Sequence, residues 1–481
     1  MAYEEISDRK LCEECGVFGI AAPPGSDLDP IYETFSGLFS LQHRGQESCG
    51  IAANDAGIIS CHKNIGLVME VFNEKTLKKM KGNAAIGHVR YSTMGKISVE
   101  NAQPIAVTHS RGNLAIAHNG NLVNAAELRS EIEMQGGIFH SSNDSEIIAY
   151  IIVQERLRTD SIEAALSLTM RRIKGAYSLL IMSPKKLIAV RDPNGFRPLC
   201  IGVLDGHFMF ASETCAIDAV GGTYIRDVQP GEIVVIEDDQ MRSIDPGVRA
   251  EPSFCSFEFI YFARPDSILE GVGVEWVRQE MGKSLARESG VEADIVIGVP
   301  DSGISAAIGY SKESGIPYGV GLIKNRYIGR TFIQPTQGQR ERAVRLKLNP
   351  LGVNIRNKRV IMIDDSIVRG TTSARIVSAL REAGAKEVHM RISSPPFLYS
   401  CCFGTDVPDS NALIAHNHTV EETSKIIGTD SLAYLSGRSL SDILMSAGCR
   451  ICDACFSGNY PITPPQQTKK NIFEQRIDES L

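Results

Sequence analysis

The first half of the chain alternates short apolar runs with turn-forming residues. The runs are rich in Val, Ile and Phe and stop at Gly, Asn, Asp or Pro, a pattern typical of β-strands. They are CGVFGIAA, CGIAAND, AAIGHVRYS, NLAIAHNGNL, YSLLIMS, LIAVRD, HFMFASE and EIVVIED, between Cys15 and Glu237. Two longer stretches, 124–134 and 144–158, carry apolar residues at helical spacing. This half therefore predicts layered sheets with helices packed against them.

The second half alternates strand-like and helix-like segments. DIVIGVP runs into SGISAAIGYSKESG, a helix that we expect to end at Gly315. RVIMIDD leads through SIVRGTTS into SARIVSALREAGA, where Ile376, Val377 and Leu380 share one helix face and Gly384 follows as a terminator. EVHMRISS then reads as another strand. This succession predicts a parallel sheet with ligand-binding loops at the carboxyl ends of its strands.

The length of the chain implies more than one domain. A chain of 481 residues is too long for one typical hydrophobic core, so two domains are expected. The irregular stretch IDPGVRAEPS places the boundary near residue 250. We expect one domain over 15–250, a second over 251–462, and a tail over 463–481 that has no periodic apolar face.

Composition and charge exclude several classes of protein. Hydrophobic residues make up 43% and charged residues 22%, as in ordinary globular enzymes. The formal net charge of -7 argues against nucleic-acid binding, which needs a basic face. No apolar run approaches the roughly 20 residues of a membrane-spanning helix. The first fourteen residues are polar and unlike a secretory signal. We therefore expect a cytoplasmic protein with no nucleic-acid or membrane partner.

The twelve cysteines do not suggest a disulfide scaffold, because cytosolic thiols stay reduced. Those at the two ends of the chain cluster, which favours chemistry or metal binding. They are Cys12 and Cys15, and Cys449, Cys452 and Cys455. Cysteines among apolar neighbours are better read as small buried hydrophobes. These are Cys49, Cys61, Cys200 and Cys215.

Three interpretations are open for the N-terminal cysteines. Cys15 could be a buried residue at the edge of a strand. Cys12 and Cys15 could form a redox pair, but the two acids between them would raise the thiol pKa values, the wrong direction for such a couple. The third interpretation, a catalytic nucleophile, depends on segments further along the chain.

Five segments in a fixed order support the nucleophile. They are CGVFGI (15–20), LQHRGQES (41–48), GHVRYST (87–93), AHNGNL (117–122) and SNDSE (142–146). Together they resemble the class II glutamine amidotransferases, which are N-terminal-nucleophile hydrolases with an αββα sandwich fold. The resemblance implies that residues 1–14 are a propeptide and that Cys15 becomes the mature N-terminus. Its freed α-amino group, with a pKa near 8, could then exchange protons with the thiol and the leaving ammonia.

The same resemblance assigns the remaining residues of a glutamine site. Asn119 and the backbone N–H of Gly120 would form the oxyanion site, which suits an amide side chain beside a glycine. Arg90 would pair with the α-carboxylate of glutamine, and Asp144 with its α-ammonium group. Arg44, in the HRGQ segment, is included among the glutamine-binding residues. Each charged residue has the alternative of an ordinary surface ion pair, and the matched order favours the functional role.

Residues 360–373, VIMIDDSIVRGTTS, form the clearest constellation in the second half. Two adjacent acids end an apolar strand, and a Gly-Thr-Thr turn then opens a helix. Such a turn directs backbone N–H groups and hydroxyls at an anion, and the helix N-terminus adds a favourable field. Carboxylates suit ribose hydroxyls or a metal ion. A plain strand-to-helix connection would not explain two consecutive acids after an apolar run.

This segment resembles the signature of type I phosphoribosyltransferases, whose domain is built on a parallel sheet. The resemblance implies that Asp364 and Asp365 face the ribose and Mg²⁺, and that Ser302 in VPDSG meets the pyrophosphate and the metal. The residues expected to hold the 5-phosphate are Arg369, Gly370, Thr371, Thr372 and Ser373. The stretch from Lys324 to Pro350 is rich in Lys and Arg and has no Asp. It is either a solvated basic loop or, as we expect beside a pyrophosphate, a flap that closes over the phosphates.

The two resemblances together imply one reaction. Glutamine, 5-phosphoribosyl 1-pyrophosphate (PRPP) and water would give phosphoribosylamine, pyrophosphate and glutamate, the first committed step of purine (IMP) synthesis. They also imply a homotetramer inhibited by AMP, GMP, ADP and GDP. One rival is an ammonia-using phosphoribosyltransferase with an inactive glutaminase half. Another is a PRPP-binding regulator without catalysis.

The remaining cysteines suggest a metal centre. The resemblance implies a [4Fe–4S] cluster held by Cys255, Cys401, Cys452 and Cys455. Four thiolates suit zinc as well as an iron–sulfur cluster, so ligand type alone does not decide. Cys402 adjoins Cys401, and Cys449 extends a C-x-x-C-x-x-C run, so either is an alternative ligand.

Overall fold

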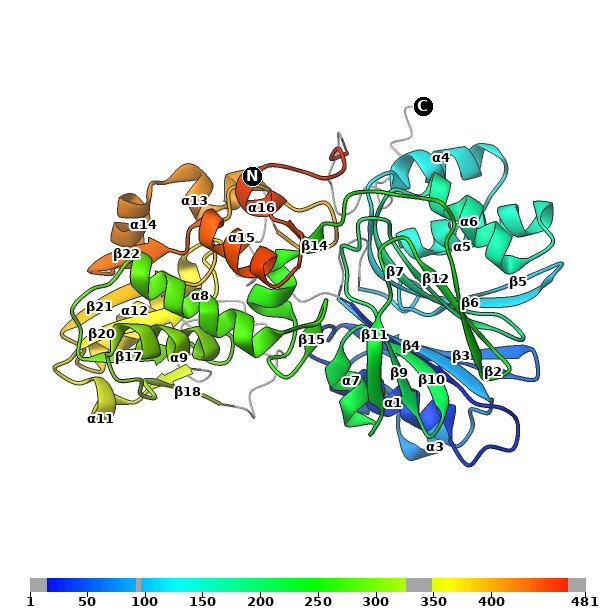
Figure 1. Ribbon diagram of the computed structural model, residues 1–481, viewed down its shortest axis with the longest axis horizontal. Helices are drawn as coiled ribbons and strands as arrows, with labels where there is room; N and C mark the ends of the chain where they lie inside the picture. The colour runs from blue at the N-terminus through cyan, green and yellow to red at the C-terminus, as the bar shows by residue number, and fades with distance from the viewer. Residues whose placement is uncertain (1–14, 92–96, 326–347, 408, 466–481) are drawn as a thin grey trace, which may run out of the picture.

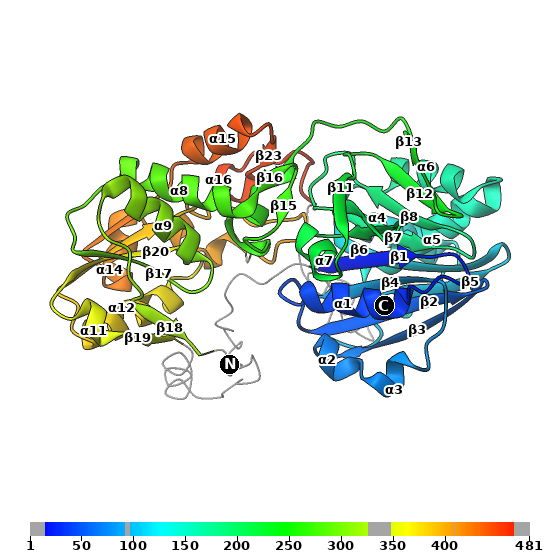
Figure 2. The ribbon, with the colours of Figure 1, turned by 60° about the horizontal axis from the view of Figure 1, so that its bottom comes forward.

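The computed structural model describes residues 15–91, 97–325, 348–407 and 409–465. These residues form two lobes, one from each half of the chain (Figure 1). In the view of Figure 2, helix α7 (Thr214–Ala219) of the N-terminal lobe lies beside strand β15 (Ile268–Leu269) of the C-terminal lobe. Among the described residues, no helix is long and apolar enough to cross a membrane.

The N-terminal lobe contains two stacked antiparallel sheets. The seven-stranded sheet has the order β11 (Thr223–Asp227), β9 (Cys200–Leu204), β10 (His207–Ala211), β1 (Gly16–Ala21), β4 (Ala84–Arg90), β2 (Ser48–Asp55) and β3 (Ile58–Ile65). The six-stranded sheet has the order β13 (Gln240–Ile244), β12 (Ile233–Glu237), β8 (Leu187–Arg191), β7 (Gly175–Met182), β6 (Gly112–Leu122) and β5 (Ile105–His109). Buried residues of both sheets, including Val17, Ala52, Ala117 and Leu180, form the core between them.

Helices cover the outer faces of both sheets. Helices α1 (Pro30–Ser40) and α7, with the short α2 (Val68–Val71) and α3 (Glu74–Leu77), lie on the side of the seven-stranded sheet. Helices α4 (Ala125–Met134), α5 (Asp144–Arg158) and α6 (Ile162–Arg172) pack on the six-stranded sheet. Each sheet is thus covered on both faces, which explains its continuous apolar runs. The lobe is the αββα sandwich that the sequence predicts.

The C-terminal lobe is built on a four-stranded parallel sheet. Its order is β17 (Ile295–Gly298), β20 (Arg359–Asp364), β21 (Glu387–Ile392) and β22 (Ser431–Tyr434). Helices α8 (Val274–Glu288) and α9 (Gly303–Ser314) pack on one face, and α12 (Thr371–Glu382) and α14 (Val420–Ile427) on the other. The predicted parallel sheet and its strand–loop–helix units are confirmed, and α9 ends at Gly315 in a left-handed conformation.

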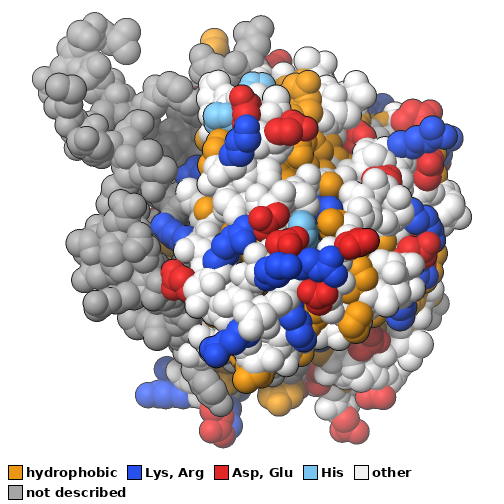
Figure 3. Space-filling view, turned by 90° about the vertical axis from the view of Figure 1, so that its left-hand side faces the viewer, with side chains coloured by type: hydrophobic (Ala, Val, Ile, Leu, Met, Phe, Trp, Pro, Cys, Tyr) orange, Lys and Arg blue, Asp and Glu red, His pale blue; other side chains and the backbone are white. Residues whose placement is uncertain are grey.

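Short elements complete the C-terminal lobe. Strand β14 (Phe254–Cys255) pairs in parallel with β23 (Ile451–Cys452), β15 pairs with β16 (Val272–Gly273), and β18 (Leu322–Lys324) with β19 (Leu348–Pro350). The short helices are the π-helix η1 (Glu258–Phe262), α11 (Gly352–Ile355), the 3₁₀ turn η2 (Ser410–Ala412), α13 (Ile414–Asn417), α15 (Gly437–Ser446) and α16 (Ala454–Ser457). Basic and acidic side chains are interspersed on the end of this lobe shown in Figure 3.

Some helices of the N-terminal lobe differ from expectation. The eight strands expected in the first half and the helices at 124–134 and 144–158 are present, whereas α1 and α6 were not predicted. Helix α1 did carry a signal, because Asp29 caps it by accepting hydrogen bonds from Ile31 N and Tyr32 N and Pro30 occupies its first turn. Helix α6 likewise begins after a Ser161 cap. Both helices begin at the cap residues that sequence signals favour.

Candidate functional site

The thiol of Cys15 lies at the buried start of strand β1. Its side chain is inside the N-terminal lobe, and Sγ is 3.4 Å from the carbonyl oxygen of Tyr91. Strand β1 pairs with β4 so that Gly16 lies opposite Val89, which places Arg90 at the same end of the sheet. The predicted propeptide, residues 1–14, lies outside the described residues.

Strand β6 presents the two residues expected to form the oxyanion site. Gly120 has φ of 147°, and a side chain there would come within 2.0 Å of the Ala176 carbonyl oxygen, so only glycine fits. The N–H of His118 donates to Gln103 Oε1 and that of Leu122 to Asp144 Oδ2. Because N–H directions alternate along a strand, the N–H of Gly120 points to this same side, between two side-chain acceptors.

The side-chain amide of Asn119 is a buried hydrogen-bond donor. The residue is 1% exposed, and within the described part of the chain Nδ2 has no hydrogen-bond partner. A buried donor left unpaired costs about 1–3 kcal/mol, so such groups signal a functional demand. A negative oxygen developing on a substrate would satisfy this donor.

Asp144 and Arg90 supply opposite charges to the same region. Asp144 is the first residue of α5, and its Oδ1 lies 3.6 Å from Nδ1 of His118. Both Asp144 and Arg90 are almost fully buried. Since Asp144 also accepts from Leu122 N at the end of β6, the structure brings the carboxylate next to the oxyanion residues.

Arg44 lies behind the nucleophile. Its Nε donates to the carbonyl oxygen of Cys15 at 3.0 Å, and its Nη atoms pair with Glu213 at 2.6 Å and with Glu258 at 2.6 and 2.9 Å. Although burial alone would raise it, the pKa of Glu213 is held below its ordinary value by His43 and Arg44. Arg44, which the resemblance places among the glutamine-binding residues, therefore contacts the backbone of Cys15 and two buried carboxylates.

The second candidate site is the loop between β20 and α12. Its cavity is lined by Tyr261 and by residues 364–373. Asp364 ends the strand and Asp365 follows it, and Gly370, in a left-handed conformation, precedes α12. Gly370 occupies the N-cap position and has no side chain to cap α12, so the first backbone N–H groups of the helix face the loop, which suits a phosphate.

Ser302 comes to this loop from the neighbouring strand. Because β17 and β20 are adjacent and parallel, their following loops meet, and Ser302 Oγ donates to Asp365 Oδ1 at 2.5 Å. Lys324 at the end of β18 pairs with Asp301 at 2.5 Å, beside Ser302. Most of the predicted flap, 326–347, lies outside the described residues.

Four cysteines gather where β14 meets β23. Cys255 and Cys452 are partners in that ladder. Burial raises the pKa of Cys455 well above its usual value, and the nearby thiols of Cys401, Cys255 and Cys452 raise it further. The amide N–H of Phe403 donates to Cys401 Sγ at 3.3 Å. The structure thus brings together the four cysteines expected to bind a cluster.

The two alternative cysteines differ in their surroundings. Burial raises the pKa of Cys449 to about 12, and its charged neighbours are Glu270, Arg191 and Asp227 rather than other cysteines. Cys402 is buried in the apolar cluster of Phe196, Phe403 and Cys452, and burial and the neighbouring Cys401 thiol raise its pKa.

The donor set of these four cysteines bears on the kind of metal. Within the described ranges, no group of three or more His, Cys, Asp or Glu residues is arranged so that it could hold a metal ion. Four thiolates suit an iron–sulfur cluster and zinc alike, so the ligand type does not choose between the two.

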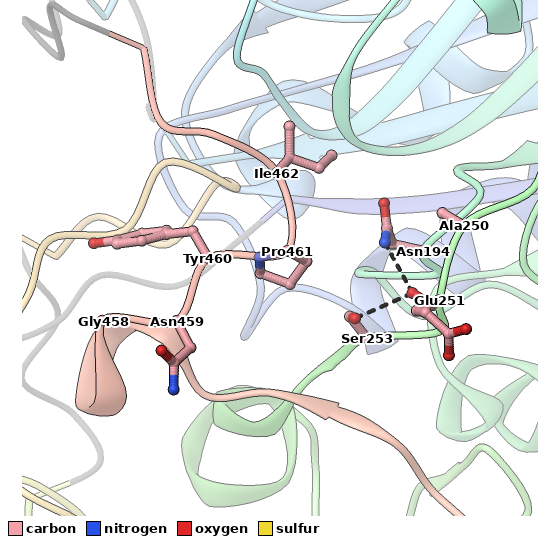
Figure 4. Close-up of a pocket in the computed structure, with 9 residues that line it drawn as sticks. All are labelled: Asn194, Ala250, Glu251, Ser253, Gly458, Asn459, Tyr460, Pro461 and Ile462. Carbon is pink, nitrogen blue, oxygen red and sulfur yellow. Dashed lines mark hydrogen bonds between the residues drawn. The ribbon is translucent and has the colours of Figure 1, made fainter.

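A larger cavity, of about 720 Å³, lies away from both sites (Figure 4). It is lined by the connection between the lobes around Glu251 and Ser253 and by residues 458–462. Glu251 is its charged lining residue and pairs with Arg450. Of the described residues that line the cavity, Ser253 and Tyr460 carry hydroxyl groups.

Comparison with known proteins identifies the family. Residues 88–219 match the family model described as a glutamine amidotransferase domain. The amidophosphoribosyltransferase of Archaeoglobus fulgidus is 51% identical over 453 residues, which cover 94% of this chain and 98% of the relative. That of Bacillus subtilis is 50% identical over 469 residues, covering 95% and 96%. The chain belongs to the amidophosphoribosyltransferase family.

Solved structures extend the match to three dimensions. The B. subtilis glutamine PRPP amidotransferase complexed with ADP and GMP is 49% identical, covers 95% of this chain and 99% of its own, and gives a TM-score of 0.88. A structure described as the allosteric regulatory enzyme of purine biosynthesis is 48% identical, covers 96% and 99%, and gives 0.90. Both lobes therefore share the amidophosphoribosyltransferase fold.

Several residues that contact the candidate site residues were not predicted from the sequence. Glu258 and Tyr261, both on η1, reach Arg44 and the phosphoribosyl loop respectively. His118 contacts Asp144 from within the AHNGNL segment. In the sequence, these residues stand out only as polar side chains inside apolar runs. Residues of ordinary buried ion pairs or hydrogen-bonded pairs show the same pattern.

Proposed function

We propose that this chain transfers the amide nitrogen of glutamine to C1 of PRPP, forming phosphoribosylamine, pyrophosphate and glutamate at the start of purine synthesis. The observation that supports it most is that one chain contains both half-sites, with the carbonyl of Cys15 tied through Arg44 to Glu258 on the helix that also carries Tyr261. The site that would release ammonia and the site that would accept it are thereby linked through buried contacts within one chain.

In the glutaminase half, Cys15 attacks the side-chain carbonyl carbon of glutamine. The negative oxygen accepts hydrogen bonds from Asn119 Nδ2 and the N–H of Gly120. Arg90 and Asp144 hold the α-carboxylate and α-ammonium groups. The C–N bond breaks, ammonia leaves with a proton carried by the α-amino group of Cys15, and water then hydrolyses the thioester to glutamate.

In the phosphoribosyl half, the loop after β20 binds the sugar phosphate. Residues 369–373 at the start of α12 hold the 5-phosphate, and Asp364 and Asp365 receive the ribose hydroxyls. Lys324 faces the pyrophosphate. Ammonia attacks C1 as the bond to pyrophosphate breaks.

Two inorganic groups complete this proposal. Asp364, Asp365 and Ser302 offer the oxygen ligands that Mg²⁺ prefers, and Mg²⁺ would neutralise charge on the departing pyrophosphate. Cys255, Cys401, Cys452 and Cys455 would hold a [4Fe–4S] cluster whose role is structural, since the reaction transfers no electrons.

The proposal includes domain limits and regulators. Residues 15–250 would form the glutaminase domain and 251–462 the phosphoribosyltransferase domain, after removal of 1–14. Because the B. subtilis relative was solved with ADP and GMP, purine nucleotides (AMP, GMP, ADP and GDP) are the expected inhibitors of a homotetramer. Inhibition assays and mass photometry test these two points.

An assay of glutamate release with and without PRPP tests the function. We expect PRPP to stimulate release, with equimolar pyrophosphate. Cys15→Ala should lose all glutamine use and keep synthesis from high ammonia, because the two half-sites lie in different lobes. Glutamine hydrolysis by that variant would refute Cys15 as the nucleophile. Binding of PRPP without any turnover would instead identify a regulator.

A further inference from the structure

A loop of the C-terminal lobe, residues 401–405, touches the oxyanion strand directly. Asn121 Nδ2, one residue beyond Gly120, donates to the carbonyl oxygen of Cys402 at 3.0 Å. A side chain at Gly404 would come within 3.4 Å of the Gly120 carbonyl carbon, so the two backbones are packed together. Gly404 has φ of 112°, which also favours glycine.

This end of β6 needs support from outside its sheet. Strand β5 pairs with β6 only over residues 112–116, whereas β7 pairs with it as far as Leu122. Among the described strands, residues 117–122 therefore have a neighbour on one side only. On the other side the side chains of Gln103 and Asp144 substitute for a strand. A strand end with one neighbour frays more readily than one held on both sides.

The 401–405 loop is itself firmly held. The ring of Phe403 stacks on Phe196 with centroids 4.3 Å apart and planes 16° apart. Arg197 donates to the carbonyl oxygen of Phe403 at 2.6 and 3.1 Å and to Thr405 Oγ1 at 3.2 Å. Cys401, at the start of the loop, belongs to the four-cysteine group. The loop thus joins that group to the oxyanion strand.

We propose that the 401–405 loop is a positioning element for glutamine hydrolysis, and that the Asn121 side chain is its anchor on the oxyanion strand. The proposal rests on the function proposed above. Oxyanion donors act only when held close to the productive geometry. The bond from Asn121 to Cys402 fixes the strand immediately after the Gly120 N–H, so the C-terminal lobe sets the position of a donor in the N-terminal lobe.

Asn121→Ala in the full-length processed enzyme tests the anchor. We expect kcat with glutamine to fall about tenfold, less than the roughly 10²–10³-fold cost of losing an oxyanion donor outright, while KM for glutamine and ammonia-dependent synthesis stay unchanged. Glutamate γ-semialdehyde forms a tetrahedral adduct with a thiolate and needs the oxyanion donors. Its inhibition constant should rise by the same factor, while that of glutamate should not change.

Asn113→Ala is the matched control. Asn113 lies on the same strand and donates through Nδ2 to the carbonyl of Gly57, also at 3.0 Å, but far from the oxyanion residues. It should leave kcat and inhibition unchanged. Equal effects of the two variants would mean that strand stability, not positioning, is responsible, and would overturn the proposal.

Phe403→Leu tests the loop independently, and decides the matter if Asn121→Ala does not fold. It removes the stacking on Phe196 and leaves every cysteine in place, so iron content should be unchanged while kcat with glutamine falls. If Asn121→Ala and Phe403→Leu both keep wild-type glutamine kinetics and wild-type inhibition by the semialdehyde, the proposed anchoring role of the loop is wrong. Cys15→Ala, measured in parallel, separates failure of the anchor from failure of the proposed function. Glutamine use by that variant would refute the proposed function itself.

Discussion

Arg44 of the N-terminal lobe and Glu258 of the C-terminal lobe form a fully buried, two-point ion pair, with Nη–Oε distances of 2.6 and 2.9 Å. The same guanidinium holds the carbonyl of Cys15 at 3.0 Å. A buried pair adds little net stability over apolar packing, but removing one partner leaves an uncompensated charge. The interface between the lobes is therefore sensitive to either residue.

Glu258→Gln should destabilise the whole chain. The amide keeps the shape but removes one negative charge from a buried network in which Glu258 pairs with Arg44 and Arg197, and Arg44 also pairs with Glu213. One positive charge is then uncompensated, which costs about 3–5 kcal/mol when a buried pair loses a partner. Calorimetry or denaturant unfolding checks this. Glu313→Gln, which breaks the more exposed pair with Arg287, is the control and should cost at most about 1 kcal/mol. Equal stability of the two variants would contradict the role of the buried pair.

Asp365→Asn should impair synthesis from ammonia and from glutamine alike. It removes a charge at the loop that faces ribose and metal, and we expect a loss of at least about tenfold in kcat/KM for PRPP, or 1.4 kcal/mol. Asp294→Asn is the control, because Asp294 pairs with Arg359 at the opposite end of the same sheet. Normal PRPP kinetics in Asp365→Asn would show that the loop binds something else.

Anaerobically purified protein should contain about four irons per chain, as expected for one cubane cluster. Cys449→Ser should keep the iron because Cys449 faces Glu270 and Arg191, whereas Cys452→Ser should lose it. Iron and acid-labile sulfide analysis of both variants gives the answer. Zinc in place of iron, or the opposite ranking of the variants, would reassign the site.

Active enzyme should begin at Cys15. The proposed base is an α-amino group, and an amide nitrogen joined to Glu14 cannot accept a proton at neutral pH. Attack of the Cys15 thiol on the preceding carbonyl would release residues 1–14. Intact-mass measurement checks the new terminus, with Cys15→Ala as the unprocessed control. Active protein that begins at Met1 or Cys12 would contradict this mechanism.

The elements that the sequence predicts best are those with a strict period. The parallel sheet follows from apolar runs such as residues 360–363, and α12 follows from the spacing of Ile376, Val377 and Leu380. Helix α1 was not predicted because its sequence signal is a cap and a proline rather than a long apolar stripe. Its exposed Tyr32 and Phe39 also place apolar side chains on the solvent-facing side, which weakens the amphipathic pattern.

The sequence singles out candidate site residues where residue type and chemistry coincide, as at Cys15, Asn119 and the paired acids. The ion pairs of Arg44 with Glu213 and Glu258 could not be predicted, since an arginine near a carboxylate-bearing substrate and one inside a buried ion pair look alike in sequence. Contacts such as that of Asn121 with Cys402 join residues far apart along the chain, and they cannot be predicted from the local pattern of a single sequence.

The pairing of β14 with β23 has a consequence for how the protein is made. Synthesis proceeds from the N-terminus, and domains generally fold as they emerge. The two stacked sheets are complete once residue 244 has left the ribosome. Cys255, by contrast, must wait for Cys452, near the other end of the chain, before its strand has a partner. A message cut short before that codon therefore yields a finished first lobe beside a second lobe that lacks two of its four gathered thiols, so the proposed cluster requires a nearly full-length chain.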